Sequence, residues 1–529
     1  MKKLLALLLC LCILAPACIA LAEITYPLEN GPTFKVWYDL DAGNSQMYTN
    51  LAESPVWQRY QELTGVKLEF MHPTYGAAKE GFSLMIANQD DWPDIIIDFA
   101  SYYNGGTVTA LEDEVIWDLT PYLEEYAPDY YALINRDART HIEFYNEDDQ
   151  CLAFDMFAVE LNPSAYSYEV RADWCEEWGI DVASLTTFDA IEVYFQKIKE
   201  EKPGVVPYMP IMSDKKNLLP VMLMGYDLTN DFMVIDGQIV YYANQDNYRE
   251  FLRRYHSWYE KGYIGVDFTS LKNATVRKQF AAGEVGCFTV AIGNGYADAQ
   301  AAGIAMDKTP YWRVSEDMVV HTYSGDEGLI SPNEGYGAVA TRHMDESLLP
   351  VFCQFMNYFY TDSGLITANY GPEGVSWDYD ENGNIKHNDW VMNNPDNTTS
   401  VMHNVCRFNY WPHAKLSGLK CNPNIIKDPV ITELRGRYRG VNEYFNTDYI
   451  LPYAVSLTAD EASDRDSIMT DVEAFVMEWT YKFIDGTADL DADWDSYVKE
   501  LEHYKLGKAI SITQDAYNRY LERLATVAE

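Results

Sequence analysis

The stretch from residue 56 to residue 98 constrains the fold most, because its pattern predicts a helix, a strand, a second helix and a second strand. Apolar residues at helical spacing run up to Gly65, a residue type that commonly ends helices. Residues 66–70 then alternate as in a strand, and 95–97 form an unbroken run of isoleucine, as in a strand buried on both faces. A strand, a crossover helix and a second buried strand predict a parallel sheet and therefore an α/β fold.

Polar and aromatic residues follow the strands of this predicted sheet. A first strand is expected at Phe34–Tyr38 with Asp39 at its end, and Asp98 and residues 99–103 follow the isoleucine run. Because ligands of open parallel sheets bind beyond the carboxyl ends of the strands, these residues are expected at a binding site.

Several segments along the chain together resemble one protein family, in that family's order. They are TGVKLEF followed by PDIII, VRADWCEEWGI at 170–180, WYEKGYIGVDF at 258–268, FAAGEVG at 280–286 and NYGPEGVSW at 369–377. This series is similar to the extracellular solute-binding proteins of ABC importers, and specifically to the large group that binds oligosaccharides. The resemblance spans nearly all of the chain beyond its leader.

The resemblance implies a two-lobed periplasmic-binding-protein-like fold (type II), with discontinuous lobes joined by a hinge and a ligand cleft between them. Residues 23–162 and about 290–345 are expected in the N-terminal lobe. Residues 163–289 and about 346–529 are expected in the C-terminal lobe, with a helical C-terminal extension. Residues 162–164 are the first expected crossing, and the buried strand at 285–292 is expected to return to the first lobe.

The N-terminus has the pattern of a secretory signal peptide. Two lysines precede the apolar stretch Leu4–Ala17, and Ala20-Leu21-Ala22 provides a cleavage site, so residues 1–22 are expected to be removed. The apolar run is short for a membrane span. Cys18 is a possible lipid-attachment site, but it lacks the leucine expected three residues upstream, so free secretion is favoured over a lipid anchor.

Composition narrows the classes of partner. The formal net charge of −42 disfavours nucleic acid and anionic membranes as partners. The 529 residues are too many for one average domain. An exported chain with an even number of cysteines allows disulfides, but buried free thiols are an equal alternative. The six cysteines beyond the leader are Cys151, Cys175, Cys287, Cys353, Cys406 and Cys421.

Aromatic residues are the main compositional signal, with 41 tyrosines and 13 tryptophans. Sugars have apolar ring faces and polar edges, which aromatic platforms with neighbouring Asp, Asn, Glu and Arg can bind. For Arg171 and Trp174 a structural role, with Asp173 as a helix cap and Trp174 in the core, is the equal alternative. The predicted ligand-binding residues are Trp37, Asp39, Asp98, Tyr102, Tyr103, Arg171, Trp174, Asn294, Tyr296, Glu373, Trp377 and Trp411.

One segment partly matches a calcium-binding loop. Asp378, Asp380, Asn382 and Asp389 stand at ligand positions, with Gly383 at the sixth. The twelfth residue is Asp instead of Glu, and the flanking residues look like strands. A hairpin turning at Asn382-Gly383 is therefore preferred over a metal site.

Motifs of common enzymes are absent: the sequence has no HExxH and no GxSxG. We therefore expect a monomeric binding protein without catalytic residues or cofactor, which delivers an oligosaccharide to a membrane permease. The alternatives are a secreted glycoside hydrolase or lyase, a binding protein for another solute such as a peptide, and a sugar-binding sensor or adhesion module.

Overall fold

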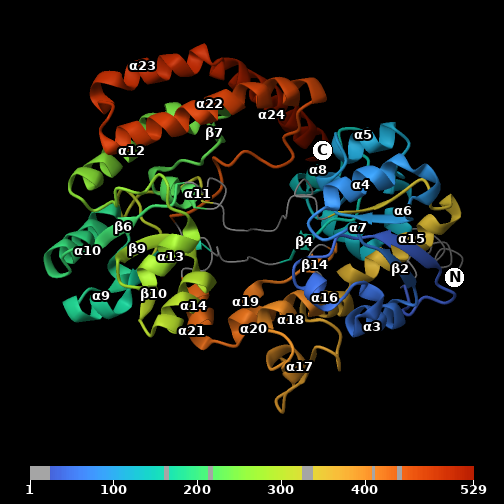
Figure 1. Ribbon diagram of the computed structural model, residues 1–529. Coiled ribbons are helices and arrows are strands. Elements are labelled where there is room, and N and C mark those ends of the chain that lie inside the picture. The colour runs from blue at the N-terminus through green and yellow to red at the C-terminus, as the bar shows by residue number, and fades with distance from the viewer. Residues whose placement is uncertain are drawn as a thin grey trace, which may run out of the picture.

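The computed structural model describes residues 24–159, 166–212, 218–323, 337–407, 411–437 and 444–528. They form two α/β lobes side by side, each with its own sheet and core (Figure 1). The leader with Cys18 and the crossing expected at 162–164 lie outside the described residues.

The first lobe is organised around a four-stranded sheet in the order β11-β3-β1-β2. β1 runs parallel to both β2 and β3, and β11 pairs antiparallel with β3. The crossover helices α3 and α4 lie where the sequence predicts them, and Gly65 ends α3 with a φ of 79°. The bounds are β1 Thr33–Trp37, α3 Pro55–Thr64, β2 Lys67–Met71, α4 Ala78–Ala87, β3 Ile95–Ile97 and β11 Ala338–Ala340.

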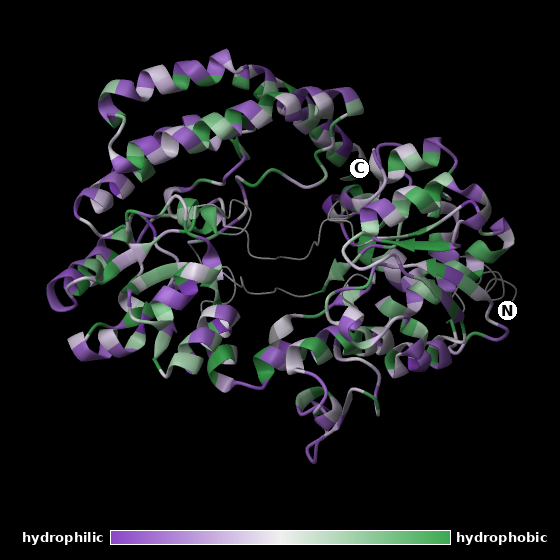
Figure 2. Cartoon of the chain, viewed as in Figure 1, coloured by the Kyte–Doolittle hydropathy of each residue, from purple (hydrophilic) through white to green (hydrophobic). Residues whose placement is uncertain are grey.

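Both faces of this sheet are buried, as the isoleucine run predicts. Ile95 and Ile97 belong to the larger core cluster of the lobe, whereas Ile96 belongs to a smaller cluster with Trp37 and Phe82. Figure 2 shows hydrophobic residues gathered in these strands. Helices of the N-terminal half complete the lobe: α2 Asn44–Met47, α5 Gly106–Glu112, α6 Thr120–Tyr126, α7 Pro128–Ile134 and α8 Ala138–Phe144.

The second lobe contains a sheet in the order β10-β5-β9-β6. β9 pairs antiparallel with β5 and parallel with β6, so it is a central strand of this sheet. The expectation that this strand returns to the first lobe is therefore wrong. A run buried on both faces suits either sheet, and only long-range pairing decides between them. The bounds are β5 Tyr166–Arg171, β6 Val206–Met209, β9 Val285–Ala291 and β10 Met306–Lys308.

The residues after 346 also differ from expectation, because the first of them belong to the first lobe. α15 (Leu349–Asn357) and α16 (Asp362–Tyr370) place Phe352, Phe355 and Ala368 in the core cluster of the first lobe. α15 packs on α6 of that lobe. Their apolar faces are equally compatible with either core, so helical periodicity cannot assign the lobe.

The predicted helical tail is present and packs mainly on the second lobe. α22 (Ala459–Asp485) lies on α12 (Asp246–Glu260), followed by α23 (Leu490–His503) and α24 (Leu506–Ala528). The other helices are α9 Ala172–Trp178, α10 Phe188–Glu201, α11 Leu219–Leu223, α13 Asn273–Ala281, α14 Ile292–Ala302, α17 Asp389–Met392, α18 Thr399–Cys406, α19 Gly418–Cys421, α20 Pro423–Ile426 and α21 Pro429–Gly436. The other strands are β4 Phe157–Ala158, β7 Phe232–Ile235, β8 Gln238–Tyr241, β12 Trp377–Tyr379, β13 Ile385–His387 and β14 Ala414–Lys415.

Two further sequence questions are answered by the described residues. The six cysteines beyond the leader are all buried as thiols and form no disulfide with one another, which favours the thiol alternative over disulfides. Among the described helices, none combines the length and apolar character needed to cross a bilayer.

Candidate functional site

The ends of β1 and β3 bring together five of the predicted site residues. Asp39 follows β1, and Asp98 follows β3 in the left-handed region, with a φ of 60°. A short 3₁₀ turn, Phe99–Ser101, then leads to Tyr102 and Tyr103. Because β1 and β3 are adjacent and parallel, their carboxyl ends meet at one edge of the sheet.

The side chains at this edge contact one another. The Tyr102 hydroxyl donates to Asp39 Oδ2 at 3.4 Å, and its ring lies edge-on to Trp37 with centroids 5.0 Å apart. Ser101 donates to Asp98 Oδ1 at 2.9 Å. Asp39 Oδ1 is buried and has no hydrogen-bond partner among the described residues. The edge therefore presents carboxylate oxygens beside an aromatic ring.

Burial changes the titration of both carboxyl groups. It raises the pKa of Asp98 to about 7, with a smaller contribution from the charge of Asp39. Burial also raises the pKa of Asp39, and the neighbouring Asp41 adds to this effect. Near neutral pH the Asp98 carboxyl group can thus accept hydrogen bonds as a carboxylate or donate one as an acid, which suits hydroxyl-rich ligands.

Trp37 and Tyr103 support this edge from within. Trp37 is only 3% exposed and packs against Phe82 and Tyr102. The Tyr103 ring stacks on Phe99, and its hydroxyl donates to Asp113 at 2.7 Å. Trp37 therefore holds Tyr102 in place and is too buried to act as a flat platform for a sugar.

The second lobe presents Asn294 and Tyr296 in the first turns of α14, directly after β9. Asn294 is exposed, and Tyr296 is partly buried beside Asp428. Both residues thus lie at the carboxyl end of β9 in the second sheet, and not in the first lobe, where the sequence placed them.

A buried carboxyl group and a buried amino group lie beneath this turn. Glu169 in β5 is 0% exposed and stands opposite Lys308 in β10, which is 2% exposed. A Cβ at position 295 would overlap Glu169 Oε2, so Gly295 lets α14 approach the carboxylate. Burial raises the pKa of Glu169 and lowers that of Lys308 to about 8, while their mutual attraction opposes both shifts.

Sequence reasoning missed this pair. Glu169 alternates with Tyr168 and Val170 along β5, a pattern typical of a strand with one solvent-facing side. Ser167 lies two positions before Glu169 on the same face of β5 and is also fully buried. A small residue at that position was the one available signal that this face is covered.

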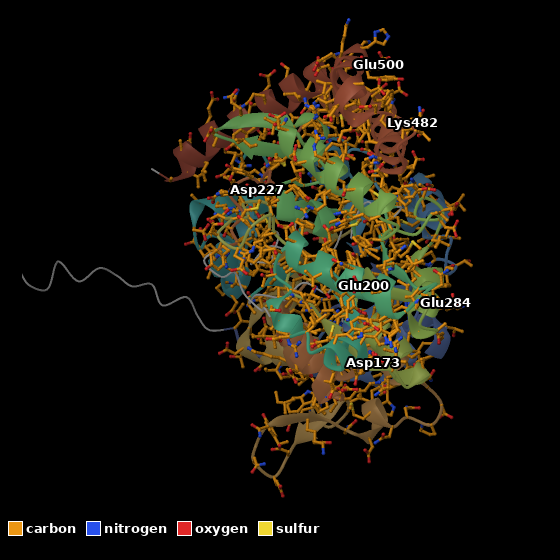
Figure 3. All side chains as sticks on the ribbon, turned by 90° about the vertical axis from the view of Figure 1, so that its left-hand side faces the viewer. Asp173, Glu200, Asp227, Glu284, Lys482 and Glu500 are labelled. Atoms are coloured by element: carbon orange, nitrogen blue, oxygen red, sulfur yellow. The ribbon has the colours of Figure 1, made fainter. Side chains whose placement is uncertain are left out.

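Arg171 and Trp174 lie at the opposite edge of the second sheet. β5 is antiparallel to β9, with Tyr166 opposite Ala291 and Val170 opposite Cys287. The end of β5, which carries Arg171, is therefore remote from the first turns of α14, which carry Asn294 and Tyr296. Figure 3 views the second lobe from the side away from the first lobe, and it labels Asp173 low on that lobe.

The contacts of these two residues are structural. Arg171 binds Asp173 with a 2.6 Å ion pair, and its guanidinium lies 4.3 Å from the centre of the Trp174 ring. Arg171 is 6% and Trp174 7% exposed. This arrangement favours the structural alternative for both, because neither side chain has surface left for a ligand.

The remaining predicted residues do not join either edge. Trp411 is 0% exposed in the first-lobe core, and Trp377 is buried with its Nε1 donating to Gly371 O at 2.6 Å. Glu373 is exposed beside the β12–β13 hairpin. Aromatic residue type alone does not separate a core position from a binding platform.

The expected hairpin is confirmed at the segment that partly matches a calcium loop. β12 and β13 pair antiparallel, and Asp380 Oδ1 accepts hydrogen bonds from the amides of Asn382 and Asn384. Asp389 begins α17 and bonds Asn393. Within the described ranges, His, Cys, Asp and Glu side chains form no group of three that could hold a metal ion.

A separate cavity of about 550 Å³ lies on the second lobe. Asn247, Glu250, Arg254 and Ser257 line it from one face of α12, together with Lys261 directly after that helix. Tyr226, Val314 and Met318 are also among its lining residues. None of the predicted site residues lines it, so we place the candidate site at the strand ends, where the chemistry gathers.

The sequence is similar to those of two known substrate-binding proteins. No family model matches the chain. A carbohydrate ABC transporter substrate-binding protein of Streptococcus pneumoniae serotype 4 is 22% identical over 251 residues, which cover 42% of this chain and 48% of that protein. The fructooligosaccharide ABC transporter substrate-binding protein FusA of the same organism is 21% identical, covering 94% of this chain and 93% of FusA.

The fold agrees with these relatives. The structure of S. pneumoniae FusA in complex with kestose matches with a TM-score of 0.68 and 17% identity, covering 93% of this chain and 99% of that one. The chain is thus a homologue of the substrate-binding proteins of carbohydrate ABC transporters and has their two-lobed fold.

Proposed function

We propose that the chain is the extracellular substrate-binding component of an ABC transporter and binds an oligosaccharide between its two lobes. The observation that carries this proposal is the edge formed by Asp39, Asp98 and Tyr102 at the carboxyl ends of adjacent parallel strands. The similarity to FusA along nearly the whole chain supports the same ligand class. Export through the N-terminal leader, a membrane permease as partner and a monomeric state belong to the same proposal.

The mechanism is binding and closure without a chemical step. Sugar hydroxyls donate to Asp39 and Asp98, and the exposed part of the Tyr102 ring packs against an apolar sugar face. The turn carrying Asn294 and Tyr296 contributes polar groups from the second lobe. Rotation of the lobes then encloses the ligand, and the ligand shifts the equilibrium only by its preference for the closed form.

Our first prediction concerns the ligand class. In a thermal-shift screen of the purified protein against oligosaccharides, one neutral family should raise the melting midpoint. A ligand that binds only the folded form adds about 2.7 kcal/mol at a hundredfold excess over its Kd. The sugar should be recovered intact by chromatography.

The other outcomes decide between the alternatives. A sugar that is consumed would indicate a hydrolase or lyase, with Asp39 and Asp98 as the first carboxylates to replace. A panel without any shift would contradict the sugar proposal and direct the screen to peptides.

A second prediction tests the edge itself. Asp39→Asn removes a charged acceptor and should weaken binding of the identified ligand about tenfold or more. The melting midpoint without ligand should change little, because Asp39 is only partly buried. Titration calorimetry measures the affinity, and Asp378→Asn on the exposed hairpin is the matched control. Equal affinities for both variants would remove Asp39 from the site.

A further inference from the structure

The C-terminal helix α24 belongs to the second lobe for most of its length. Leu506 and Ala509 are buried in the core cluster of that lobe. Gln514 accepts from Ile239 N at 2.7 Å and donates to Gly237 O at 3.3 Å, which fixes the helix to the β7–β8 hairpin. Its last turns leave this lobe and reach α8 of the first lobe (Figure 1).

Arg523 makes the principal contact at this junction. Its guanidinium donates to Tyr145 O at 2.8 Å and to Ile142 O at 3.3 Å, two carbonyls at the end of α8. The carboxylates of Asp149 and Glu147 lie close enough to interact with its charge. A cation at a helix C-terminus is favoured by the exposed carbonyls and by the helix dipole.

Neighbouring groups hold the same junction. Ser456, which precedes α22, donates to Glu147 of the first lobe at 2.9 Å. Arg519 binds Glu461 of α22 with a 2.6 Å ion pair, so α24 is fixed to α22 one turn before the contact. The end of α24 is therefore held rigidly from the second-lobe side and bonded to the first lobe through Arg523.

A second contact between the lobes lies on the opposite side of the molecule (Figure 1). There α21 packs on α14 of the second lobe, and α20 packs on α18, which lies against α2 of the first lobe. Among the described residues, these two separated contacts hold the lobes together, and two bodies held in this way rotate most easily about the line through both. The strand edges that carry Asp39 and Asn294 lie in the lobes on either side of this line.

We propose that Arg523 and the last turns of α24 form a pivot, one of two, about which the lobes rotate. The statement that this rotation encloses a ligand rests on the proposed function. The statement that the contact restrains the lobes is independent of that function. The pivot keeps the edge that carries Asp39 aligned with the edge that carries Asn294 while the distance between them changes. Loss of this contact should therefore change the motion of the lobes, although the contact lies far from the proposed ligand site.

The test replaces Arg523 with glutamate, which Glu147, Asp149 and the two carbonyls should repel. Hydrogen exchange of the amides in 138–147 should become about tenfold faster or more, since charged hydrogen bonds are lost. Small-angle scattering without ligand should show a larger radius of gyration. Arg253→Glu is the matched control, because Arg253 pairs with Glu250 and Asp491 within the second lobe. Arg523→Lys should give intermediate values if the glutamate variant does not fold.

Each outcome decides the proposal. Faster exchange with a larger radius, absent in the control, supports the pivot. Faster exchange with an unchanged radius shows a local contact only and overturns it, as does no change in either quantity. Neither readout needs a ligand, so a failed sugar screen would contradict the proposed function and leave this result standing.

Discussion

Replacement of Trp411 with alanine should lower the free energy of unfolding by about 3–5 kcal/mol. The indole is fully buried and lies edge-on to Tyr38, Trp57 and Phe355, with ring centroids 5.0 to 6.3 Å apart. Its removal leaves a cavity that the surrounding rings cannot fill without leaving their own packing. Denaturant unfolding followed by circular dichroism measures the loss.

Tyr379→Ala provides the control for this prediction. Tyr379 is 58% exposed on the β12–β13 hairpin, and its truncation should change stability little. A Trp411→Ala variant with unchanged stability and weakened sugar binding would contradict the core position. It would return Trp411 to the binding site where the sequence placed it.

Trp411 illustrates why aromatic composition predicted the ligand class better than the ligand site. Its neighbours Tyr38, Trp57 and Phe355 come from distant parts of the chain, so its burial depends on tertiary packing that no local pattern contains. The same limit placed β9 in the wrong lobe. Periodicity identified that strand correctly, but its pairing is decided by β5 and β6, which lie far from it in the sequence.

The site at the strand ends of the first lobe could be predicted because a single rule about parallel strands was sufficient. Parallel strands end at the same edge, and β1 and β3 are both identified by short apolar runs, so Asp39 and Asp98 had to be neighbours. In the second lobe the rule failed at Arg171, because β5 is antiparallel to β9. The alternation of residues in a strand does not show the direction in which the strand runs. The carboxyl ends of β5 and β9 therefore look alike in the sequence but lie at opposite edges of the sheet.

The second prediction with a large effect concerns Glu169 and Lys308. Glu169→Gln keeps the shape of the side chain and removes the ionisable carboxyl group that stands opposite the buried Lys308. Glu169 and Lys308 attract each other, so the loss of this attraction at a desolvated amino group should lower the free energy of unfolding by about 1–3 kcal/mol. Unfolding at pH 7 should show this loss. Glu478→Gln, which removes an exposed partner of Lys482, should have little effect.

The double variant Glu169→Gln with Lys308→Met separates pairing from packing. If the charges act as a pair, the double variant should regain much of the stability lost in Glu169→Gln, since no buried charge remains. Additive losses would instead show that each side chain acts through its own packing. The distinction matters for the candidate site, because Glu169 touches α14 at Gly295, between Asn294 and Tyr296. A true pair would stabilise, by electrostatics at the base of the second lobe, the turn that we propose to face the ligand.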